Sequence, residues 1–159
     1  MAPGQRSMKL RRVGSATWSG DLKEGKGAVS TRSRALSGYP YGYESRIDGV
    51  RGTNPEELLA AAHASCFTMG LVMMLERIGK VALQIETQAE VTLEDTADGY
   101  VIPAVHLKTR ANVPGLDEAA FADAATQAKI HCPVSRLFRA EITLDATLSE
   151  SISVLEKRT

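Results

Sequence analysis

The sequence predicts an α+β fold in which antiparallel sheets pack around a long central helix. Three observations predict this class: two segments that read as β-hairpins, a long apolar helix between them, and a pair of helices followed by a closing strand. The order is three strands, long helix, hairpin, helix pair and strand. Because strands and helices do not alternate, a repeating parallel β-α-β architecture is not expected.

Length and charge restrict the possible functions. The 159 residues, 43% of them hydrophobic, are enough to bury one substantial core, so we predict a single domain at residues 8–150 between a flexible leader (1–7) and a tail (151–159). Nineteen basic residues balance nineteen acidic ones, which gives no net field to attract nucleic acid or a membrane surface. The first residues lack the apolar run of a secretory signal, so we expect a cytoplasmic protein.

The first hairpin is expected from residues 9–18 and 27–31, whose strand-forming residues flank a glycine-rich turn at 20–27. Residues 41–48 alternate in polarity and predict a third strand, which places Arg46 on a polar face with Glu44 and Asp48. From the pattern alone, Arg46 is a solvated strand residue paired with neighbouring acids.

A long helix is predicted over residues 54–78. Asn54 suits the N-cap, Pro55 suits the first helical position, two acidic residues follow in the first turn, and Gly79 ends the helix. Polar residues interrupt its apolar run, which favours a buried helix over a transmembrane one. Beyond the first turn it is apolar on nearly all sides, and a chain this short is not expected to bury all of these sides by itself.

The second half of the chain predicts a hairpin, two helices and a strand. Residues 81–93 and 100–113 flank a turn-rich loop, and Asp117 can cap a helix that is interrupted at Cys132-Pro133 before a short helical piece to residue 139. Residues 141–148 form the closing strand.

The two cysteines occupy different settings. Cys66 lies in the middle of the apolar helix, where a cysteine is usually a small core residue. Cys132 precedes a proline that can begin a helical turn, whose free amides would stabilise a thiolate. Two cysteines cannot form a disulfide framework, and in a reducing compartment any bond between them is expected to form and break in a cycle.

Several chemistries remain open for these cysteines. His63 with Cys66, and His131 with Cys132, would supply four zinc ligands, although the spacing matches no common zinc motif. Either cysteine could also pair with a histidine to form a nucleophile for acyl transfer, but no glycine-rich oxyanion turn adjoins either cysteine. Glycine-rich phosphate-binding motifs are absent. Thiol redox chemistry, in which a sulfenic acid is resolved by a second cysteine, needs only residues that the sequence contains.

Two segments of the sequence are distinctive: GTNPEELLAAAHASCF at residues 52–67 and CPVS at residues 132–135. Both closely resemble the OsmC/Ohr family of thiol-dependent peroxidases, and the OsmC branch in particular. The resemblance extends over nearly the whole chain and leaves out only the first seven residues and the tail after Ser149. It implies the OsmC-like fold and an intertwined homodimer with two active sites at the interface.

The resemblance also implies a role for each site residue. Cys66 corresponds to the peroxidatic cysteine and Cys132 to the resolving one. Arg46 matches the arginine that holds the thiolate and orients the hydroperoxide, and Glu56 matches the acid that fixes this arginine. Ile47 stands where a phenylalanine is common in the family, a change that would reshape the pocket wall.

The implied activity is the reduction of hydroperoxides, with organic ones preferred and hydrogen peroxide possible, in defence against oxidative or osmotic stress. No metal, haem, flavin or other prosthetic cofactor is expected, because electrons would come from an external dithiol or a lipoyl-type reductant such as a lipoylated protein. Nucleic acid and membrane are not expected partners. The alternative is a non-catalytic dimeric stress-response or small-ligand-binding protein of the same fold.

One geometric consequence follows from helix dimensions. Glu56 and Cys66 are ten residues apart on one predicted helix, so their backbones lie roughly 15 Å apart along its axis. Either Arg46 bridges much of this distance, or a partner chain supplies Glu56. Both arrangements remain possible from the sequence.

Overall fold

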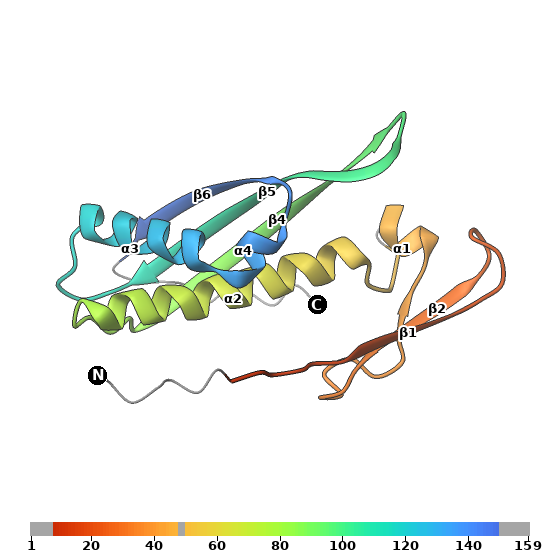
Figure 1. Ribbon diagram of the computed structural model, residues 1–159, viewed down its shortest axis with the longest axis horizontal. Helices are drawn as coiled ribbons and strands as arrows, with labels where there is room; N and C mark the ends of the chain where they lie inside the picture. Colours follow the sequence, from red (N-terminus) through yellow and green to blue (C-terminus); the bar gives the residue numbers. More distant parts are fainter. Residues whose placement is uncertain (1–7, 48–49, 150–159) are drawn as a thin grey trace. The chain divides into compact units, whose positions relative to one another are not determined.

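The computed structural model describes residues 8–47 and 50–149, which fall into two compact units, Met1–Pro55 and Glu56–Thr159 (Figure 1). Each unit contains its own three-stranded sheet. The predicted leader (1–7) and tail (151–159) lie outside the described residues. The single domain at residues 8–150 stays a prediction.

The first unit contains the predicted first hairpin. Strands β1 (Gly14–Ser19), β2 (Lys26–Thr31) and β3 (Tyr39–Tyr41) pair antiparallel in that order. The rings of Trp18 and Tyr41 contact each other with centroids 5.7 Å apart. Gly27 lies beside both rings, and a Cβ there would come within 2.5 Å of the Tyr41 ring. The hairpin therefore needs glycine at this position for its aromatic pair to close.

The predicted third strand over residues 41–48 is wrong at residues 43–47, because Tyr43–Ile47 forms a short helix, α1. The buried Ser45 hydroxyl accepts from the Gly42 amide at 2.9 Å and donates to the Thr53 carbonyl at 2.8 Å. Such side-chain bonds to backbone compete with strand pairing. In a helix, residues two apart point to different sides, so Arg46 does not share a face with Glu44. Asp48, the third member of the predicted face, lies outside the described residues.

Helix α2 (Pro55–Arg77) confirms the predicted long helix. Pro55 is its first residue and Glu56 and Glu57 lie in its first turn, as predicted. It ends where Gly79 adopts a positive φ of 71° and the amide of Lys80 donates to the carbonyl of Leu75. By length and composition α2 is apolar enough to cross a membrane, a property that the core helix of a globular protein also shows.

The sheet of the second unit consists of β4 (Gln84–Thr96), β5 (Gly99–Asn112) and β6 (Glu141–Leu148). Strands β4 and β5 form the predicted antiparallel hairpin. Strand β6 pairs with β5 in parallel, so this sheet is mixed and not wholly antiparallel as predicted. The physical reason is the connection between the two strands: two helices carry the chain back across the sheet before β6 begins. The α+β class itself is confirmed.

Two helices connect β5 to β6. Helix α3 (Glu118–His131) begins at Asp117, whose side chain accepts from the amide of Ala120, and α4 (Pro133–Leu137) follows with Cys132 as its N-cap. Helices α2 and α3 pack together and on one face of the sheet, and the core lies in this layer (Figure 1). Its most deeply buried apolar residues include Phe67, Leu71, Leu75, Leu107, Phe121 and Ala125.

Candidate active site

The second unit brings the two cysteines together. Cys66 projects from the middle of α2, and Cys132 is the N-cap of α4. Although they are far apart in the sequence, their side chains are close enough for Cys132 to raise the pKa of Cys66, and both are free thiols. The pair is therefore placed so that a disulfide can form between them within one chain.

Backbone amides in the first turn of α4 act on both sulfur atoms. The amide of Val134 favours the thiolate of Cys66, and the amide of Ser135 donates to Cys132 Sγ at 3.4 Å. The first amides of a helix have no partners within the helix, so they are free to bind a thiol or thiolate. Pro133 favours this arrangement, because it begins the helix immediately after Cys132.

The two thiols differ in accessibility. Cys132 is 2% exposed, whereas Cys66 is half-buried. A small reagent therefore reaches Cys66 more easily than Cys132. This asymmetry agrees with the roles implied by the sequence resemblance, in which Cys66 meets the peroxide first.

The surroundings of Cys66 raise the pKa of its thiol above the ordinary value. Burial is the largest cause, the neighbouring Cys132 acts in the same direction, and the amide of Val134 opposes them by stabilising the thiolate. The thiolate is the nucleophilic form. The surroundings of Cys66 in the second unit therefore do not stabilise its thiolate as much as a reactive cysteine needs. A nearby positive charge would supply the missing stabilisation.

The structure places the other two predicted site residues on different elements. Arg46 lies on α1 in the first unit, and Glu56 lies in the first turn of α2; both are half-buried. Glu56 and Cys66 thus share one helix, as the sequence predicted, and remain ten residues apart along it. The grouping of Arg46 and Glu56 with the cysteines stays a prediction.

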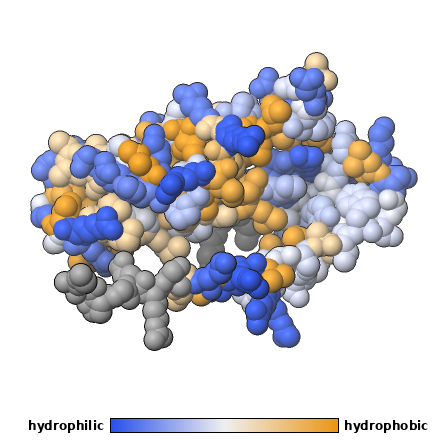
Figure 2. Space-filling view, viewed as in Figure 1, coloured by the Kyte–Doolittle hydropathy of each residue, from blue (hydrophilic) through white to orange (hydrophobic). Residues whose placement is uncertain are grey.

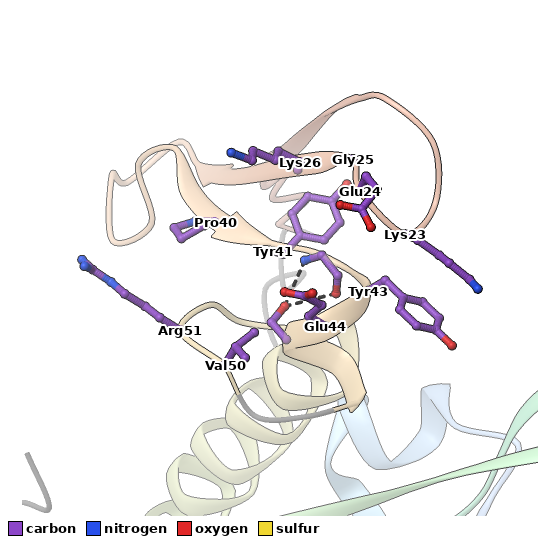
Figure 3. A pocket seen from close by; sticks show the side chains of 13 residues that line it. Lys23, Glu24, Gly25, Lys26, Pro40, Tyr41, Tyr43, Glu44, Val50 and Arg51 are labelled. Carbon is purple, nitrogen blue, oxygen red and sulfur yellow. Dashed lines mark hydrogen bonds between the residues drawn. The ribbon is translucent and has the colours of Figure 1, made fainter.

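A polar cavity of about 330 Å³ lies beside α1 in the first unit (Figure 3). Tyr41, Tyr43, Glu44 and Ser45 are among the residues that line it. In Figure 3 the charged ends of Lys23 and Arg51 point outward from the cavity. Its lining includes neither cysteine.

His63 takes part in the site in a way that sequence reasoning missed. The side chain is 0% exposed, and its Nε2 lies 2.7 Å from Ser135 Oγ. From the sequence, His63 was a candidate zinc ligand or a candidate base for a cysteine nucleophile. In the structure this nitrogen meets a serine and not a thiol. The spacing of three residues between His63 and Cys66 was the available signal, and it did not identify Ser135 as the partner.

The described part of the chain contains no cluster of side chains that would support the zinc alternative. Among residues 8–47 and 50–149, no three His, Cys, Asp or Glu side chains gather in a way that would hold a metal ion. His131 is exposed at the end of α3, whereas Cys132 beside it is buried. Because His131 faces solvent and Cys132 faces the core, the two side chains are poorly placed to bind the same ion.

Lowering the pH is expected to destabilise the protein through His63. Burial lowers the pKa of this imidazole below its ordinary value of 6.5, so below pH 6.5 the unfolded chain binds a proton that the folded chain excludes. The contribution to stability is complete above pH 6.5 and is lost as the pH falls through the folded-state pKa. Urea unfolding of wild type and His63→Gln between about pH 8 and about pH 5 tests this. An equal loss of stability in both proteins would contradict it, and His131→Gln is the exposed control.

Comparisons with known proteins agree on one family. Residues 48–147 match the profile of the OsmC-like protein family. The chain is 46% identical over 141 residues to peroxiredoxin OsmC of Escherichia coli K12, an alignment that covers 89% of this chain and 99% of that protein. It is 32% identical over 104 residues to the organic hydroperoxide resistance protein of Xanthomonas axonopodis pv. citri, covering 64% and 70% of the two chains.

The fold agrees with solved structures. The crystal structure of the organic hydroperoxide resistance protein OhrB of Bacillus subtilis superposes with a TM-score of 0.65 at 23% identity, covering 86% of this chain and 98% of that one. At this identity the likeness establishes the fold.

Proposed function

Because the chain belongs to the OsmC-like protein family, we propose that it is a cysteine-dependent peroxidase that reduces hydroperoxides to alcohols or water. The observation that carries this proposal is the pair of free thiols on α2 and α4, which are close enough for one to shift the pKa of the other and which differ in exposure. Relatives named peroxiredoxin OsmC and organic hydroperoxide resistance protein support the same activity.

The proposed cycle has three balanced steps. The Cys66 thiolate attacks the terminal oxygen of the hydroperoxide, the O–O bond breaks, and an alcohol or water leaves while Cys66 becomes a sulfenic acid. The thiol of Cys132 then attacks this sulfur, forming the disulfide and releasing water. An external dithiol, or a lipoyl group carried by another protein, reduces the disulfide and restores both thiols. These steps require no prosthetic cofactor.

Arg46 and Glu56 complete the proposed site. The guanidinium of Arg46 would lower the pKa of Cys66, against the effect of burial, and would orient the hydroperoxide by hydrogen bonds. The carboxylate of Glu56 would hold Arg46 in place. In the described part of the chain, the Val134 amide is the one group whose effect on the pKa of Cys66 favours the thiolate, so a cation beside the sulfur would add the stabilisation that the proposed cycle needs.

We propose organic hydroperoxides as the preferred substrates, hydrogen peroxide as a second one, and the cytoplasm as the location, in defence against oxidative stress. The printed name of the Xanthomonas relative supports the organic preference. In the cytoplasm a supply of reduced thiols keeps the cycle running. Steady-state kinetics with an alkyl hydroperoxide and with hydrogen peroxide would measure the preference.

The protein is expected to be a homodimer. Helix α2 leaves apolar side chains exposed along one side, including Met69 at 69%, Val72 and Met73, and Figure 2 shows hydrophobic residues at the surface of the second unit. A second copy would cover them and can bring Glu56 of one chain toward the site of the other. Light scattering of the reduced protein measures the assembly. A monomer that retains full peroxidase activity would contradict the proposal.

Intact-protein mass spectrometry after one equivalent of an organic hydroperoxide tests the proposed function. We expect the protein mass to fall by the mass of two hydrogen atoms. Peptide mapping should assign this change to a disulfide between Cys66 and Cys132 of one chain, and a dithiol should restore the original mass. An unchanged mass with both thiols still open to alkylation would contradict it. That result would favour the alternative, a non-catalytic dimeric binding or stress-response protein of the same fold.

A further inference from the structure

His63 connects the two cysteine-bearing segments of the second unit. It lies on α2 three residues before Cys66, within one turn of the same helix. Its Nε2 is 2.7 Å from Ser135 Oγ on α4, and its ring lies 5.4 Å from the ring of Phe138, the C-cap of α4. One side chain of α2 therefore contacts both the first turn and the end of α4.

Ser135 extends this connection to the sulfur of Cys132. Its hydroxyl meets His63, and its own amide donates to Cys132 Sγ at 3.4 Å. Ser135 is 8% exposed, so neither bond is open to replacement by bulk solvent. A continuous set of contacts thus runs from Cys132 through Ser135 and His63 to the backbone that carries Cys66.

Packing alone does not explain a histidine at this position. The side chain is completely buried, and within the described part of the chain its Nδ1 has no hydrogen-bond partner. A buried polar atom without a partner costs free energy that an apolar ring would not. A phenylalanine would keep the ring contact with Phe138 without that cost. The histidine therefore contributes through its bond to Ser135.

We propose that His63 is a positioning residue for the resolving step, in which it holds α4 so that Cys132 can attack the Cys66 sulfenic acid. This inference rests on the proposed function. In that step the sulfur of Cys132 forms the S–S bond, the S–O bond of Cys66 breaks, and the hydroxide leaves as water with the thiol proton. Attack of Cys66 on the peroxide uses α4 only through the backbone amide of Val134, whereas the second step needs the sulfur of Cys132 itself to reach Cys66. Loss of the bond between His63 and Ser135 is expected to slow the second step selectively.

The test measures the two steps separately in the full-length protein. The protein is mixed rapidly with one equivalent of an alkyl hydroperoxide and quenched with a sulfenic-acid trap or an alkylating reagent. Mass spectrometry of the quenched samples then gives the rates of sulfenic acid and disulfide formation. His63→Phe keeps the ring, and Ser135→Ala removes the hydroxyl while keeping the amide that contacts Cys132. We expect both variants to slow disulfide formation about tenfold and to change the first rate less than about twofold. Both should also accumulate more sulfinic acid when excess peroxide is added.

Two further variants separate positioning from a general loss of stability. Thr68→Val removes another side-chain hydrogen bond of α2, the 2.8 Å bond to Thr87 on β4, and leaves α4 untouched. Ser135→Thr retains a hydroxyl and is expected to restore most of the rate lost in Ser135→Ala. Equal slowing in Thr68→Val, or unchanged disulfide formation in both His63→Phe and Ser135→Ala, would overturn the inference. Absence of any disulfide in the wild type would instead refute the proposed function.

Discussion

Cys66→Ser is expected to lower hydroperoxide consumption by about a thousandfold or more, because a serine hydroxyl at this site is a far weaker nucleophile than a thiolate. Cys66 is the more exposed of the two thiols and lies at the first turn of α4, where the amide of Val134 can stabilise its charge. The measurement is peroxide loss in the presence of excess dithiol, with the fold of the variant confirmed by circular dichroism.

Cys132→Ser is the matched control, since it makes the same atomic change at the other thiol. This variant is expected to consume a first equivalent of hydroperoxide at the wild-type rate and, when a second equivalent is supplied without dithiol, to accumulate sulfinic acid at Cys66, because no second cysteine intercepts the sulfenic acid. Cys132 is buried, so it should not replace Cys66 as the attacking group. Equal peroxide consumption by wild type and Cys66→Ser would refute the peroxidase assignment.

Arg46→Gln is expected to slow the attack on hydroperoxide about tenfold to about a hundredfold near neutral pH. Burial and the neighbouring Cys132 raise the pKa of Cys66. In the proposed site the guanidinium of Arg46 opposes them, so without it only the Val134 amide would favour the thiolate. The pH profile of Cys66 alkylation should therefore move to higher pH in the variant, and raising the pH should recover part of the rate. Stopped-flow kinetics across pH measure both effects.

Arg51→Gln removes the same charge from an exposed position in the same unit and should leave the profile unchanged. A matching change at Glu56, Glu56→Gln, is expected to give a smaller loss in the same direction, because its proposed role is to hold Arg46. If Arg46→Gln and Arg51→Gln behave alike, the thiolate is stabilised by another group and the assignment of Arg46 is wrong.

The sequence predicted the elements that have local signals. Asn54-Pro55 and Gly79 bound α2, Asp117 caps α3, and Pro133 begins α4, each as predicted from residue types within a few positions. The error at residues 43–47 has a specific cause. The alternating pattern favoured a strand, but Ser45 donates to the carbonyl of Thr53, eight residues away, and this bond favours the helix. A period-two pattern contains no information about that contact.

The sequence by itself determined the α+β class, the order of elements and, through two motifs, which cysteines to examine. Only the tertiary structure decided the parallel pairing of β6 with β5, the approach of Cys132 to Cys66, their unequal exposure, and the bond between His63 and Ser135. The physical reason is the range of the interactions. Caps, turns and periodicity act over a few residues, whereas burial, pKa and the partner of a buried nitrogen depend on segments that packing alone brings together.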